Sequence, residues 1–186
     1  MRIKLFFLLL LPFMMFAEKP LINFSAGDQY IYDAKYHVSE GNTRCYRIIY
    51  DVLSVDENGV ALVSCSSQGQ KPLFIVGYSY NVLITPEKKI FMEKPWCCYD
   101  LKWEMRSREQ VEFYLFPLEY YRKKGWSNFH QDGNIYSFEE KSKSLCCNYV
   151  SFCELIMDPK SGLALQFRIS NEERQYFEVS RQDQSE

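Results

Sequence analysis

Apolar and polar side chains alternate along much of this chain. Between residues 30 and 38 every second position is Tyr, Tyr, Ala, Tyr and Val, and residues 46–52 repeat the pattern with Tyr, Ile, Tyr and Val. Successive side chains on a β-strand point to opposite faces, so a period of two is typical of strands with one buried face. The sequence therefore predicts β-sheet rather than helix.

Short polar turns separate these runs. Residues 40–42 (Glu-Gly-Asn) follow the first run, and residues 56–59 (Asp-Glu-Asn-Gly) precede the apolar residues 60–63. Asn-Gly is a strong hairpin signal because both residues tolerate a positive φ. Residues 85–89 and 158–162 are turns by composition. Local turns between neighbouring runs favour antiparallel pairing.

About ten short strands are expected, with little helix. Residues 100–110 fit either a strand pair or a short helix, and residues 118–124 fit one helical turn. The expected strands are 30–38, 46–52, 60–63, 73–84, 90–92, 111–116, 133–139, 145–157, 163–169 and 175–179. The predicted fold is all-β: an antiparallel meander curved into a half-barrel or a sandwich.

The first seventeen residues have the pattern of a secretory signal peptide. Arg2 and Lys4 precede an apolar run of residues 5–16, and Ala17 is followed by polar residues. The run is shorter than the ~20 residues that span a bilayer, and no transmembrane span is expected in the mature chain. We expect residues 18–180 to form a single domain, with residues 181–186 as a frayed tail.

The expected location is the periplasm or the extracellular space. No cysteine lies near residue 17, so no lipoprotein acylation site is expected. An uncleaved signal acting as an anchor is the alternative. Removing Arg2 and Lys4 leaves 20 basic against 24 acidic residues. Because this balance offers no basic excess to neutralise a phosphate backbone, nucleic acid is not an expected partner.

Seven cysteines are disulfide candidates in an oxidising compartment. They are Cys45, Cys65, Cys97, Cys98, Cys146, Cys147 and Cys153. A bond within either adjacent pair would need strained geometry, so we expect a link between the 97–98 and 146–147 segments. The count is odd, so at least one thiol stays free or pairs with another chain.

Aromatic residues are the other excess, with 14 Tyr, 14 Phe and 3 Trp. Such side chains fill β-cores, and they also line ligand pockets and interfaces. The candidates for a ligand or partner surface are Trp96, Trp103, Tyr120, Tyr121 and Trp126. Residues 120–126 combine aromatic and basic side chains, which suits peripheral contact with a membrane, but a solvated loop is the favoured interpretation.

No catalytic motif is present in the sequence. The two histidines, His37 and His130, are expected on the surface, and neither has a nucleophile at a recognisable spacing. The carboxylates of the middle third are balanced by arginines and fit a solvated face. We expect no enzyme activity, no metal site and no cofactor.

Three short pieces carry a family resemblance. They are Gly27-Asp28-Gln29-Tyr30-Ile31-Tyr32, Val55-Asp56-Glu57-Asn58-Gly59-Val60 and Asp158-Pro159-Lys160-Ser161-Gly162-Leu163. This layout resembles uncharacterised bacterial periplasmic β-meander proteins and, more distantly, the half-barrel lipoprotein carriers of the periplasm. The resemblance implies a curved sheet that cradles an apolar ligand, and it transfers no functional residue.

Two functions remain open at this point. The first is an exported, non-enzymatic protein that binds an apolar ligand or an envelope component in a concave, aromatic-lined sheet. The alternative is a structural cell-envelope protein held to its partners by disulfides through the odd cysteine.

Overall fold

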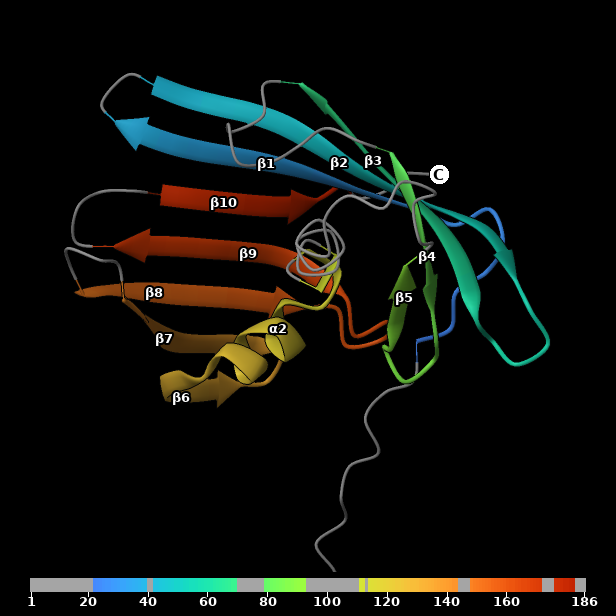
Figure 1. Ribbon diagram of the computed structural model, residues 1–186. Helices are drawn as coiled ribbons and strands as arrows, with labels where there is room; N and C mark the ends of the chain where they lie inside the picture. Colours follow the sequence, from blue (N-terminus) through green and yellow to red (C-terminus); the bar gives the residue numbers. More distant parts are fainter. Residues whose placement is uncertain are drawn as a thin grey trace, which may run out of the picture.

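The structure, a computed structural model, is one curved antiparallel sheet with a short helix on its concave side (Figure 1). It describes residues 22–39, 42–69, 79–92, 111–112, 114–143, 148–171 and 176–182. The strands are β1 (Gln29–Ser39), β2 (Asn42–Val55), β3 (Ala61–Gly69), β4 (Tyr80–Ile84), β5 (Ile90–Met92), β6 (Trp126–Asp132), β7 (Ile135–Lys143), β8 (Asn148–Met157), β9 (Ala164–Asn171) and β10 (Tyr176–Arg181).

The strands form two meanders that meet at one seam. Their order is β5-β4-β3-β2-β1-β10-β9-β8-β7-β6, so each strand pairs with a chain neighbour except at the contact of β1 with β10. All pairs are antiparallel, and the described strands leave β5 and β6 as the two edges. The predicted all-β antiparallel meander is confirmed, in the form of one open curved sheet.

Alternation explains the buried face of the N-terminal meander. Tyr32 lies opposite Ile48, and Ala34 lies opposite Tyr46; all four are buried. The intervening side chains point to the outer face. Two of them, Asp33 and Arg47, form an ion pair there. A shift of register by one residue would expose the whole apolar set, so the pattern itself fixes the pairing.

The β2–β3 turn forms where the Asn-Gly pair predicts it. The carboxylate of Asp56 accepts hydrogen bonds from the backbone N–H groups of Asn58 and Val60. Gly59 has φ 75°, and a Cβ added there would lie 3.0 Å from the Pro86 side chain. Glycine at this position therefore allows both the turn and the close approach of the β4–β5 turn.

One apolar segment differs from expectation. The predicted strand over residues 111–116 is wrong, because residues 111–112 and 114–115 are helical, and helix α2 (Pro117–Lys124) follows. A short apolar run does not distinguish a buried strand from a buried helix by periodicity. Pro117 opens α2, Glu119 lies in its first turn and three basic residues lie in its last, which matches the helix dipole.

Other differences concern one edge strand and the ends of strands. Edge strand β6 was not expected, because its side chains beyond Ser127 are exposed and carry no alternation. Residues 133–134 form the β6–β7 turn rather than part of a strand. Arg181, assigned to the tail from sequence, is the last residue of β10. Residues 73–78 and 100–110 lie outside the described part of the chain.

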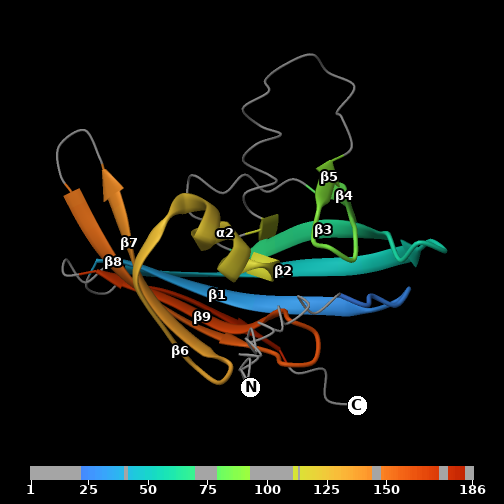
Figure 2. The same cartoon turned by 90° about the horizontal axis from the view of Figure 1, so that it is seen from below.

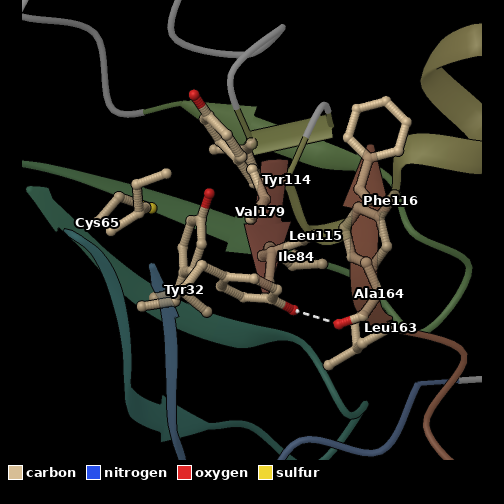
Figure 3. Close-up of a cluster of buried hydrophobic side chains, with 14 of the residues drawn as sticks. Tyr32, Cys65, Ile84, Tyr114, Leu115, Phe116, Leu163, Ala164 and Val179 are labelled. Atoms are coloured by element: carbon tan, nitrogen blue, oxygen red, sulfur yellow. Dashed lines mark hydrogen bonds between the residues drawn. The ribbon is translucent and has the colours of Figure 1, made fainter. Parts of the chain in front are cut away.

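The hydrophobic core lies between the concave face and the helical segment. Figure 2 shows the sheet bent into a trough with α2 over its concave side. Tyr114, Leu115 and Phe116 pack into the trough among side chains from both meanders (Figure 3). The hydroxyl of Tyr32 on β1 donates a buried hydrogen bond to the carbonyl of Ala164, the first residue of β9. The core thus joins the two halves of the sheet.

Candidate ligand-binding cavity

A cavity of about 570 Å³ lies where α2 meets the ends of the sheet. It is bounded by α2, the β4–β5 turn, the β6–β7 turn and the β8–β9 loop. Its lining residues are Lys88, Leu118, Glu119, Arg122, Gly133, Asn134, Tyr136, Met157, Asp158, Pro159 and Gly162. Chain segments far apart in sequence therefore build one site.

Helix periodicity places the α2 residues. Arg122 follows Leu118 by four residues and Glu119 by three, which places all three on the side of α2 that lines the cavity. Tyr121 points to another side and is buried, with ring centroids 5.1 Å from Phe138 and 5.4 Å from Phe167. Burial raises the pKa of the Tyr121 hydroxyl well above its ordinary value. Tyr121 thus anchors the helix while its neighbours face the cavity.

An ion pair joins α2 to the β4–β5 turn. The Lys88 ammonium lies 2.9 Å from a Glu119 carboxylate oxygen, and the two side chains are only 10% and 20% exposed. The same ammonium lies 5.7 Å from the centre of the Phe116 ring. The second Glu119 oxygen is buried and accepts no hydrogen bond from the described residues. This contact closes one side of the cavity.

Asp158 organises the opposite side. Its carboxylate accepts hydrogen bonds from the Lys160 backbone N–H, the Ser161 hydroxyl and the Arg181 guanidinium. Burial works against ionisation of this carboxyl, but these three donors outweigh it and lower its pKa to about 2. The β8–β9 loop is therefore tied to the end of β10.

The β6–β7 turn is fixed to β8 by paired amide contacts. The Asn134 side-chain amide donates to the Met157 carbonyl, and the Met157 N–H donates to the Asn134 carbonyl, both at 2.9 Å. Met157 and Tyr136 thereby face the cavity from a rigid base. Preformed walls lower the entropic cost of binding.

The lining suits a ligand with an apolar body and an anionic end. Leu118, Tyr136, Met157 and Pro159 supply apolar surface. Arg122 is exposed at the rim, whereas both carboxylates that line the cavity are ion-paired. No serine, cysteine or histidine is among the described lining residues.

Three of the five sequence-predicted aromatic residues, Tyr120, Tyr121 and Trp126, are described by the structure, and none of them lines the cavity. Tyr120 is half-buried, with its ring 5.0 Å from Tyr121 and 4.5 Å from the Lys124 ammonium. Trp126 is half-buried at the start of β6 and stacks on Phe129. Trp96 and Trp103 lie outside the described residues. The lining residues carry little sequence signal, because most belong to turns.

Three of the candidate cysteines lie on described strands. Cys45, Cys65 and Cys153 carry free thiols; the first is exposed and the other two are buried. Burial raises the pKa of the Cys65 and Cys153 thiols to about 12, so both are inert core residues. Cys97, Cys98, Cys146 and Cys147, with the disulfide expected between their segments, lie outside the described part.

The described residues show no metal-ligand cluster and no membrane-spanning helix. No group of three His, Cys, Asp or Glu side chains there could hold a metal ion. Both histidines lie at the surface: His130 on edge strand β6, and His37 near the end of β1 with its ring 2.7 Å from the Thr43 hydroxyl. Within the same residues, no helix has the length and apolarity needed to cross a bilayer.

Comparison with known proteins gives weak structural resemblance. No protein-family model and no curated protein sequence matches the chain. The chain is similar to one in the Pseudomonas aeruginosa MucA/MucB complex, with TM-score 0.31 and 11% identity over 84% of this chain and 51% of that one. MucB alone matches with TM-score 0.32 and 10% identity, over 84% of this chain and 53% of that one. This chain thus spans about half the length of those proteins.

A third similarity covers most of both chains. A putative outer membrane lipoprotein-sorting protein domain from Vibrio parahaemolyticus matches with TM-score 0.28 and 12% identity, over 83% of each chain. These weak structural similarities agree with the weak resemblance that the sequence has to periplasmic β-meander proteins and lipoprotein carriers.

Proposed function

We propose that this protein is exported and binds an amphiphile with an apolar, acyl-chain-like body, without catalysing a reaction. The cavity between α2 and the sheet carries this proposal. Its volume of about 570 Å³ lies within the ~300–1,000 Å³ range of small-molecule sites. The apolar wall formed by Leu118, Tyr136, Met157 and Pro159 fits the apolar body, and Arg122 fits an anionic end.

A binding role also agrees with how the charges are arranged. Glu119 is paired with Lys88, and Asp158 is paired with Arg181. General acid–base chemistry needs a carboxylate or imidazole that is poised to exchange a proton with a substrate. The two lining carboxylates instead hold the walls together, which supports ligand binding over catalysis.

The test is binding of cis-parinaric acid, a fluorescent fatty acid, to the purified chain. We expect saturable binding by the wild type. Leu118→Trp fills the cavity from α2 and is expected to weaken binding at least ten-fold. Leu53→Trp introduces the same side chain at an exposed position on β2 and is the matched control. Thermal unfolding of both variants confirms that they are folded.

Native mass spectrometry of the purified chain completes the test. A mass excess that organic extraction removes would support a bound apolar ligand. Parinaric acid that fails to bind the wild type, or that binds Leu118→Trp as well as the wild type, would overturn the proposal.

The same mass spectra test the second candidate, a disulfide-linked envelope protein, which the exposed Cys45 thiol on the outer face favours. That candidate requires covalent adducts that disappear with reductant.

A further inference from the structure

A basic and aromatic surface adjoins the cavity. It consists of Arg122, Lys123 and Lys124 from the last turn of α2, and Trp126 and Phe129 from β6. The three cations and Phe129 are exposed, and Trp126 is half-buried. Only Gly125 separates the helix from the strand, so α2 leads directly into the edge strand (Figure 2). We call this the α2–β6 surface.

The aromatic part of the α2–β6 surface is held firmly from behind. Trp126 and Phe129 stack with ring centroids 4.6 Å apart and planes at 25°. Trp126 also lies 5.2 Å from the buried Phe138 ring, so a continuous set of rings runs from the core to Phe129, which is 43% exposed. An aromatic pair on a rigid base, with Phe129 exposed, costs little entropy when it enters an interface.

The basic part of the surface contrasts with the rest of the chain. The whole chain has a net charge of −2, yet α2 carries three basic residues in its last turn against one acidic residue, Glu119. That glutamate is already paired with Lys88 on the β4–β5 turn. Lys123 pairs with the buried Glu112 and still leaves 59% of its side chain exposed. Glu140 on β7 lies opposite Trp126 and interacts electrostatically with Lys124. The three cations still outnumber Glu112 and Glu140, the two carboxylates placed against them, and such a local positive surface on an acidic protein favours an anionic partner surface.

Basic and aromatic side chains together are the chemistry of a lipid headgroup layer. Lysine and arginine are attracted to anionic phospholipid, and tryptophan is enriched at the membrane–water interface. The cavity lies next to this surface, since Arg122 belongs to both and the Tyr136 ring in the cavity wall lies 6.2 Å from Phe129. A protein resting on lipid through this surface would bring the cavity against the bilayer.

We propose that the α2–β6 surface docks on membranes containing anionic phospholipid and that the cavity takes its amphiphile from that membrane. The second half of this proposal rests on the proposed function, whereas docking stands on the surface alone. Each cation contributes about five-fold to membrane affinity. Removing two therefore lowers affinity about 25-fold.

The experiment is co-sedimentation of the full chain with phosphatidylcholine vesicles, with and without one-third phosphatidylglycerol. We expect binding only to the anionic vesicles, and loss of binding in about 0.5 M salt. The double variant Arg122→Gln/Lys124→Gln should bind about 25-fold more weakly. The control Lys35→Gln/Arg47→Gln removes the same charges from the outer faces of β1 and β2 and should bind like the wild type.

Fluorescence tests the aromatic contribution. Anionic vesicles should shift the tryptophan emission to shorter wavelength, brominated lipid should quench it, and Trp126→Phe should remove most of that response.

Equal binding to both vesicle types, or equal loss of binding in the two double variants, would overturn docking. Leu118→Trp separates the two proposals: it should still sediment with anionic vesicles but fail to take up parinaric acid from them. Vesicle binding without uptake by the wild type would overturn the cavity's role and leave docking intact.

Discussion

Asp158 shows how one side chain can hold a functional loop. Its carboxylate accepts three hydrogen bonds, from Lys160 N–H at 2.9 Å, the Ser161 hydroxyl at 2.7 Å and Arg181 at 3.0 Å. The donors come from the β8–β9 loop and from the end of β10. Since the loop forms one wall of the cavity, we expect this residue to matter for stability and for cavity shape together.

We expect Asp158→Ala to lower the free energy of unfolding by about 1–3 kcal/mol at pH 7, because it also leaves Arg181 without its partner. The folded-state pKa of about 2 lies below the ordinary value. The stabilisation is therefore complete above the ordinary pKa and is lost as the pH falls through about 2. Urea unfolding from pH 7 down to pH 2 should show the difference between wild type and variant shrinking at the acid end.

Lys160→Ala is the control for this prediction. It removes an exposed side chain but keeps the backbone N–H that Asp158 accepts, so it should unfold like the wild type at every pH. A difference between Asp158→Ala and wild type that stays constant down to pH 2 would show that the carboxylate charge does not stabilise the loop.

At the scale of elements, the helical segment is joined to the sheet by a buried hydroxyl pair. The Tyr46 hydroxyl on β2 and the Tyr114 hydroxyl lie 2.7 Å apart. Burial raises the pKa of both groups, so both stay protonated and one donates to the other. Tyr46→Phe and Tyr114→Phe each remove one partner. We expect a double-mutant cycle in urea unfolding to give a coupling of about 0.5–1.5 kcal/mol.

A second cycle provides the comparison. Tyr32→Phe removes a different buried hydrogen bond, from the Tyr32 hydroxyl to the Ala164 carbonyl. Combined with Tyr114→Phe, it should give additive losses within about 0.5 kcal/mol. Additivity in the Tyr46–Tyr114 cycle as well would mean that the segment is held by apolar packing alone.

The elements differ in how far the sequence could predict them. Strands β1 and β2 were predictable because their buried and exposed residues alternate strictly, and the Asn-Gly pair at 58–59 marked the turn that follows. Residues 111–116 were not, because a short apolar run fits a buried helix equally well. Edge strand β6 has few buried side chains, so pairing with β7 rather than periodicity defines it.

The cavity was less predictable than the sheet. Its lining comes from α2 and from turns around residues 88, 133 and 158, whose meeting depends on the curvature of the whole sheet. The sequence emphasised aromatic residues, but Tyr121 is buried in the core, and Tyr120 and Trp126 lie beside the cavity. One sequence signal could have pointed to Leu118 and Arg122. It is the pattern of an amphipathic helix over residues 117–124 that begins at Pro117.

For the whole molecule, the important contact is the seam between the two meanders. β1 and β10 pair in register from Tyr32 with Arg181 to His37 with Tyr176. Val179, which is 2% exposed, lies at this seam opposite Ala34 on β1 and Phe167 on β9. Its side chain therefore contributes to a core that both halves share, and the halves should unfold together.

We expect Val179→Ala to lower the free energy of unfolding by about 1–3 kcal/mol and to weaken both meanders equally. Peptide-resolved hydrogen exchange in mild denaturant measures this, since a cooperative unit loses protection in all of its strands at once. Ser180→Ala, the next residue and on the opposite face, should leave exchange unchanged. Loss of protection confined to β6–β10, with β1–β5 protected as in the wild type, would mean that each meander folds alone. A trough made of two independent halves could not hold α2 and the cavity in fixed positions, so this measurement also tests the structural basis of ligand binding.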